Sequence, residues 1–212
     1  MSGMAPVYVV TDIEADGPRP GEHSMLSFAS VAVTASGETR GVFEAVLEPL
    51  PGAVRDPDTY AWFQTQPEAW AAATADPRPP ADVMAQFVAF VRGLGAPALF
   101  AAFPVAFDGM WIDAYLKRFT PHALIEGHYA AQPLFAGPGL CLKSFAAAVT
   151  GQDFAECDPK TLPADWLGHH EHTHKAIDDA RGYAHLLGVL MALAGREPGR
   201  KRHEDSRRSP RA

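Results

Sequence analysis

The alternation of apolar and polar positions predicts a sheet in the first quarter of the chain. Residues 7–11 form a short run of β-branched and aromatic side chains, which is typical of a central strand. Residues 25–34 and 39–47 are also strand-like, and residues 36–38 form a turn between them. These segments predict a hairpin or meander at the start of the chain.

Helical spacing replaces this alternation in the middle of the chain. Short helices are expected at residues 58–64 and 67–73, the second with proline at its first position. Residues 81–92 repeat apolar side chains every three or four positions, as a helix packed on one face does. A buried strand at residues 98–103 and a helix from about residue 107 to 119 follow.

The last third of the chain predicts fewer regular elements. A short helix is expected at residues 142–149 and a long one from about residue 175 to 194. Residues 127–139 are irregular, and residues 153–168 are mostly loop. An antiparallel start followed by strand–helix alternation predicts an α/β fold, a mixed sheet with helices on both faces.

Composition limits the class of protein. A chain of 212 residues with 47% apolar side chains fits one domain with a sizeable core. Two cysteines make neither a disulfide scaffold nor a zinc motif. Residues 1–6 lack the pattern of a signal peptide, and no apolar run approaches the roughly 20 residues of a membrane span. We expect a soluble, cytoplasmic protein with no membrane partner.

Charge divides the chain into two parts. Residues 195–212 hold seven Lys or Arg and three Asp or Glu, a net charge of +4, which leaves −11 on residues 1–194 when the whole chain carries −7. We expect a single domain at residues 1–194 and a flexible basic tail at 195–212, a solvated end or a loose tether for nucleic acid. An acidic body repels long polyanions unless metals neutralise its site, which favours short or single-stranded nucleic acid as partner.

Four acids and one histidine stand where the predicted elements would bring them together. Asp12 and Glu14 directly follow the first strand and, two residues apart, point to one side. Asp108 follows another strand at the start of a helix, and ligand sites in α/β sheets gather at such strand ends. Asp179 lies in the first turns of the last helix, with His174 just before it. Each acid alone has a plainer explanation as a strand-end or helix-start carboxylate, and only the set is specific.

This set suits the hydrolysis of phosphodiesters. Mg²⁺ and Mn²⁺ prefer oxygen ligands, and two such ions roughly 4 Å apart stabilise both the attacking and the leaving oxygen. Four carboxylates nearly balance the charge of two ions. A histidine with a pKa near neutrality can take the proton of the attacking water.

Three motifs resemble those of the DnaQ-like 3′–5′ exonucleases of the DEDDh type. Residues 174–180 match the family's H-x-A-x-x-D-A in full. Residues 105–108 resemble its aromatic-Asp pair at a helix start, and residues 11–14 resemble its D-x-E. The resemblance covers residues 7–190. Two departures concern substrate contacts: Ala15 stands where many relatives have Thr, and Pro104 where many have Asn.

The resemblance implies a ribonuclease-H-like fold, two divalent metal ions (Mg²⁺ or Mn²⁺) and release of nucleoside monophosphates from a 3′ end. It also implies the roles of the five residues. The metal ligands would be Asp12, Glu14, Asp108 and Asp179, and the general base, also counted among the catalytic residues with them, would be His174.

Substrate contacts and oligomeric state are less defined by the sequence. The candidates for contact with a terminal nucleotide are Ala15, Tyr60, Trp62, Phe63 and Phe107. Core packing of a short helix is an equal explanation for the aromatic residues at 60, 62 and 63. A homodimer is one of the assemblies open to the chain.

Two other functions compete with the exonuclease. His170, Glu171 and His174 fit H-E-x-x-H, a zinc metallopeptidase signature that requires both histidines on one helix face. The stretch has no apolar face of its own, which argues against it; the histidines at 169, 170, 172 and 174 could instead bind Zn²⁺ or Ni²⁺ adventitiously. A non-catalytic nucleic-acid-binding protein on the same fold is the third reading, disfavoured because all four carboxylates are present.

Overall fold

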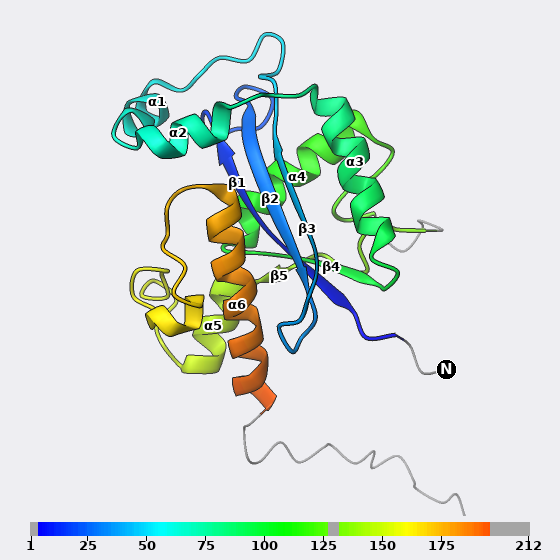
Figure 1. The fold of residues 1–212 in the computed structure, drawn as a ribbon, viewed down its shortest axis with the longest axis vertical. Helices are drawn as coiled ribbons and strands as arrows, with labels where there is room; N and C mark the ends of the chain where they lie inside the picture. The colour runs from blue at the N-terminus through cyan, green and yellow to red at the C-terminus, as the bar shows by residue number, and fades with distance from the viewer. Residues whose placement is uncertain (1–3, 127–131, 196–212) are drawn as a thin grey trace, which may run out of the picture.

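A five-stranded sheet forms the centre of the protein (Figure 1), in a computed structural model that describes residues 4–126 and 132–195. The strands are β1 (Val7–Ala15), β2 (Met25–Val33), β3 (Thr39–Val46), β4 (Ala98–Ala102) and β5 (Leu140–Cys141). The helices are α1 (Pro57–Gln64), α2 (Pro67–Thr74), α3 (Pro80–Gly93), α4 (Val105–Phe119), α5 (Leu142–Thr150), the 3₁₀ turn η1 (Ala164–Leu167) and α6 (Ala176–Gly195).

The sheet is mixed, as the sequence predicts. Its strand order is β3-β2-β1-β4-β5. β1, β2 and β3 pair antiparallel, whereas β4 and β5 run parallel to β1. The connection from β3 to β4 passes through α1, α2 and α3. The predicted α/β class with antiparallel first strands is confirmed.

Helices cover both faces of the sheet and make two separate apolar layers. α3 and α4 pack on one face, and α5, η1 and α6 pack on the other. Successive residues of β1 alternate between them: Val9 and Ile13 enter the first layer, and Val10 enters the second. Asp12 and Glu14 share the parity of Val10, so their side chains point toward α6.

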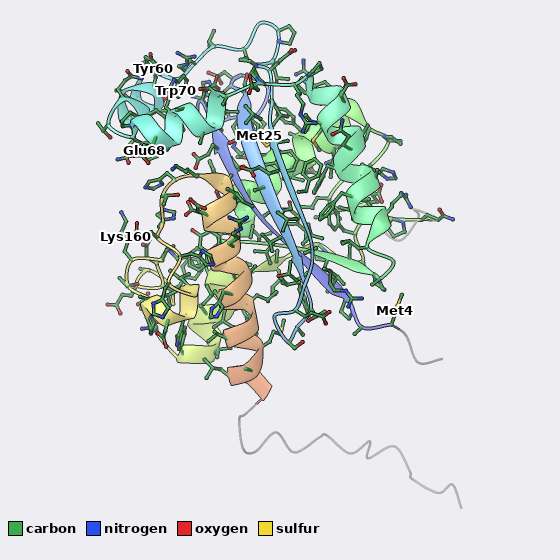
Figure 2. All side chains as sticks on the ribbon, viewed as in Figure 1. Met4, Met25, Tyr60, Glu68, Trp70 and Lys160 are labelled. Carbon is green, nitrogen blue, oxygen red and sulfur yellow. The ribbon has the colours of Figure 1, made fainter. Side chains whose placement is uncertain are left out.

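Two helices near the end of β1 form a small unit of their own, the α1–α2 hairpin. Proline occupies the first turn of each helix, and Asp56 caps α1 by accepting a hydrogen bond from the Thr59 N–H at 2.8 Å. Phe63 packs with three other buried side chains in a third apolar cluster under the hairpin. Figure 2 shows Tyr60 and Trp70 on this hairpin and Lys160 on a loop at the same side of the molecule.

The structure differs from the sequence-based prediction at three elements. β1 continues past the predicted residues 7–11 to Ala15, so Asp12 and Glu14 lie within the strand and not after it. The reason is that backbone pairing between β1 and β2 continues as far as Ala15. β5 was not predicted because two residues carry no periodic signal. η1 falls in a predicted loop.

Some predictions concern residues that the structure does not describe. These are residues 1–3, which belong to the segment tested for a signal peptide, residues 127–131 of the predicted irregular stretch, and residues 196–212 of the basic tail. Among the described helices, none combines the length and the apolarity needed to cross a membrane.

Candidate active site

A cavity of about 320 Å³ lies where the ends of β1 and β4 meet the starts of α4 and α6. It is lined by all five residues that the sequence singles out: Asp12, Glu14, Asp108, His174 and Asp179. The parallel strands β1 and β4 deliver the first three to the same end of the sheet. The last helix packs on β1 and supplies Asp179, and the loop that directly precedes this helix supplies His174. The predicted juxtaposition is therefore present.

The carboxylates come from three different elements. Asp12 and Glu14 leave the same side of β1, and each offers an oxygen within 4.8 Å of an oxygen of Asp179. Asp108 lies in the first turn of α4 and is 3% exposed, while Asp12 and Asp179 are 9% and 4% exposed. Such a group of nearly buried acids is costly to keep ionised without a counter-charge.

Burial dominates the electrostatics of this acidic group. It raises the pKa of Asp12 and of Glu14 well above their ordinary values, and repulsion from the neighbouring carboxylates raises both further. Burial raises the pKa of Asp108 to about 8, against hydrogen bonds from backbone N–H groups that lower it. The Oδ1 atom of Asp179 is buried and accepts no hydrogen bond from any described residue.

These features fit divalent cations with oxygen ligands. Mg²⁺ and Mn²⁺ prefer oxygen ligands, and negatively charged carboxylates such as these are typical ones. An ion would both offset the mutual repulsion of the acids and satisfy the free oxygen of Asp179.

His174 precedes α6 rather than lying within it. Its backbone is left-handed, with φ of +56°, and α6 begins at Ala176. On a continuous helix, residues 174 and 179 would point in different directions, and the non-helical backbone at His174 removes this constraint. Burial and the neighbouring His172 lower the pKa of His174, an effect that Asp179 opposes. A neutral imidazole, the form that accepts a proton, is favoured near neutral pH.

Other cavity residues were not found from the sequence. Tyr183 lies one turn after Asp179 on α6, stacks on Phe103 with ring centroids 5.1 Å apart, and has a pKa raised by burial. Its four-residue spacing from Asp179 was the available signal. Lys143 of α5 and Lys160 of the following loop bring positive charge to the cavity. The sequence gives no sign that these lysines face the cavity, and Lys160 lies on a loop that has no periodic pattern.

The five substrate-contact candidates have different positions. Phe107 lines the cavity and is 40% exposed, and Trp62 is 39% exposed with its ring against His174. Phe63 is 1% exposed in the core of the α1–α2 hairpin, so its prediction as a substrate contact is wrong. Tyr60 packs on Trp70 under the Arg55 guanidinium rather than at the cavity. Ala15 is buried and is not among the cavity-lining residues.

The zinc-peptidase alternative fails on geometry. The segment from His170 to His174 is not helical, so its two histidines do not share a helix face. His170 and Glu171 are exposed, and neither belongs to a described group of clustered metal-ligand side chains. His170 instead lines a separate hollow beside Arg181 and His185.

Comparisons with known proteins find likeness at the level of the fold. No protein-family model and no curated protein sequence matches the chain. Among solved structures, the zinc-bound form of the Escherichia coli exonuclease I–ssDNA complex superposes with a TM-score of 0.59 at 16% identity, over 91% of this chain and 41% of that one. The chain therefore spans about two fifths of exonuclease I.

Two further structures match over most of both chains. The nuclease domain of 3′hExo, a DEDDh family member bound to rAMP, gives a TM-score of 0.61 at 10% identity, covering 89% of this chain and 92% of that one. A 3′-exonuclease with a histone mRNA stem-loop gives 0.61 at 10% identity, covering 89% and 82%. The protein therefore shares its fold with solved 3′-exonucleases, among them one described as a DEDDh family member.

Proposed function

We propose that this protein is a metal-dependent 3′–5′ exonuclease that releases nucleoside monophosphates from the 3′ end of single-stranded RNA or DNA. The observation that carries the proposal is the meeting in one cavity of four carboxylates from three elements and one histidine from the loop before α6. The fold supports it because the solved structures with this fold include 3′-exonucleases.

The acidic group would hold two divalent ions, Mg²⁺ or Mn²⁺, through Asp12, Glu14, Asp108 and Asp179. When bound, such ions stabilise the attacking and the leaving oxygens of the phosphodiester. β1, α4 and α6 bring the four side chains to the same cavity, and those of Asp12, Glu14 and Asp179 have oxygens within 4.8 Å of one another.

His174 would serve as the general base. Its lowered pKa keeps the ring neutral, so it can accept a proton from water at the cavity. The water oxygen bonds to phosphorus, the bond from phosphorus to the 3′ oxygen of the preceding nucleotide breaks, and that oxygen takes up a proton. The products are a nucleoside 5′-monophosphate and a strand with a new 3′ hydroxyl.

The cavity surroundings suit a single strand with a free end. Phe107 and Trp62 present exposed rings on which a base could stack. Lys143 and Lys160 supply positive charge for phosphate inside an otherwise acidic body. Of the solved structures with this fold, one is a complex with ssDNA and another recognises a histone mRNA stem-loop, so the proposal includes both DNA and RNA.

The deciding experiment is digestion of matched RNA and DNA oligomers with Mn²⁺. A 5′-labelled strand should give a descending ladder, a 3′-labelled strand should release its label as mononucleotide first, and a 3′-phosphate should block both. EDTA should stop the reaction. Cleavage of a circular strand would contradict exonucleolytic action, and no cleavage of any substrate would favour a non-catalytic nucleic-acid binder.

A further inference from the structure

His172 lies in the cavity but has no part in the proposed hydrolysis. Its Nδ1 atom is 2.9 Å from Oδ1 of Asp179, and its ring meets that of His174 edge to face with centroids 4.3 Å apart. One ligand atom of each of these three side chains lies within 4.8 Å of the other two. Two imidazoles and one carboxylate thus form a compact group at one wall of the cavity.

Among the described residues, the only ion-pair partner of this carboxylate is the His172 imidazole. The Asp179 side chain is 2% exposed, and its Oδ1 accepts no hydrogen bond from a described residue, so the short distance to His172 lacks hydrogen-bond geometry. A buried carboxylate oxygen in that state is unfavourable. The side chain of His172 is 27% exposed, which leaves the group open to an ion from solvent.

We propose that His172, His174 and Asp179 form an inhibitory zinc site. Zn²⁺ accepts imidazole nitrogen and carboxylate oxygen, and three protein ligands with water as the fourth complete its tetrahedron. Nitrogen ligands favour Zn²⁺ over Mn²⁺ and Mg²⁺. The neighbouring group of Asp12, Glu14 and Asp179 offers oxygen alone and keeps the opposite preference.

The two groups share Asp179, so one ion can exclude another. Zinc at the histidine group would also occupy the nitrogen lone pair with which His174 is proposed to accept a proton. The expected consequence is reversible inhibition by zinc, opposed by manganese or magnesium. This inhibitory part rests on the proposed function, whereas metal binding by the three side chains does not.

Cobalt tests the site without any reaction. Co²⁺ replaces Zn²⁺ in tetrahedral sites and then absorbs visible light strongly, whereas octahedral oxygen sites absorb weakly. We expect the full-length protein to give the strong band in proportion to one cobalt per chain, and Zn²⁺ to remove it. His172→Ala and His172→Gln should lose the band, while the matched control His170→Ala, from the same loop, should keep it. A strong band that survives in both His172 variants, or its absence from the unsubstituted protein, would overturn the site.

Zinc inhibition tests the consequence. Each variant's hydrolysis of a single-stranded oligomer in Mn²⁺ is expressed relative to its own rate without zinc. The zinc concentration for half inhibition should rise about tenfold or more in His172→Ala, because changes even to residues that only support a metal site lower metal affinity by about that factor. It should stay unchanged in His170→Ala. Equal inhibition of all three proteins would overturn the inhibitory role. A cobalt band without nuclease activity would refute the proposed function and leave the metal site standing.

Discussion

The indole of Trp62 meets the imidazole of His174 edge to face, with ring centroids 4.9 Å apart and 89° between the ring planes. Trp62 belongs to α1, and His174 directly precedes α6, so the contact joins segments that are distant in sequence. A second link runs parallel to it, because Lys175 Nζ lies 3.2 Å from a carboxylate oxygen of Glu68 on α2. The α1–α2 hairpin thereby contacts the loop that carries the proposed general base at two successive residues.

We predict that Trp62→Ala lowers kcat several-fold through disorder of His174. Edge-to-face aromatic pairs contribute about 0.5–1.5 kcal/mol beyond area burial, enough to shift the population of a partly exposed ring. Trp62→Phe should retain most of the rate, because it keeps an aromatic edge. NMR of the His174 ring reports the effect independently: its resonance should broaden or shift in Trp62→Ala and stay near its position in Trp62→Phe. A fall in rate in Trp62→Ala with an unchanged His174 resonance would contradict this positioning role.

Substitution of His174 separates catalysis from metal binding. His174→Ala should lower kcat by about 10²–10⁴-fold, the usual contribution of a positioned acid or base. Manganese binding by calorimetry should persist, because the four carboxylates remain. Glu171→Ala and His170→Ala should retain the nuclease rate, since both residues are exposed outside the cavity. Loss of activity in all three variants would revive a role for the H-E-x-x-H stretch.

Removal of a carboxylate should have opposite effects on activity and on stability. Asp12→Asn or Asp179→Asn should abolish hydrolysis. In the metal-free protein, Asp12→Asn should raise the melting temperature, because it removes a buried charge repelled by its neighbours. For a chain of this length the rise is about 2–4 °C per kcal/mol of repulsion relieved. A lower melting temperature for Asp12→Asn without metal would contradict this electrostatic account.

The raised pKa values also predict how metal-free stability depends on pH. Asp108 has a folded-state pKa of about 8, above its value in an unfolded chain. At pH values between these two pKa values, the folded protein binds more protons than the unfolded one. The contribution of Asp108 to stability is complete below the unfolded pKa and declines as pH rises toward about 8. As pH rises, the melting temperature of the unsubstituted protein should fall more than that of Asp108→Asn. Saturating Mg²⁺ should reduce this difference. A pH profile identical in both proteins would exclude the shift.

The sequence by itself determined the order of the elements and the identity of the acidic group. The period of two in the first strands and of three to four in the helices marks one buried face of each element, and this signal is local. The two-residue spacing of Asp12 and Glu14 is enough to predict that their side chains point to the same side of the strand. The three motifs at residues 11–14, 105–108 and 174–180 together pointed to the family that the chain resembles, and the solved structures confirm the fold.

Tertiary structure decided everything that depends on contacts between distant segments. Phe63 and Trp62 are neighbours in the sequence, yet one fills a core and the other faces His174, because a helix turns successive side chains about 100° apart. Lys160 and His172 lie on irregular chain without a period, so only the packing of their loop against α6 brings them to Asp179. The pKa shifts likewise exist only after folding, since burial and proximity create them.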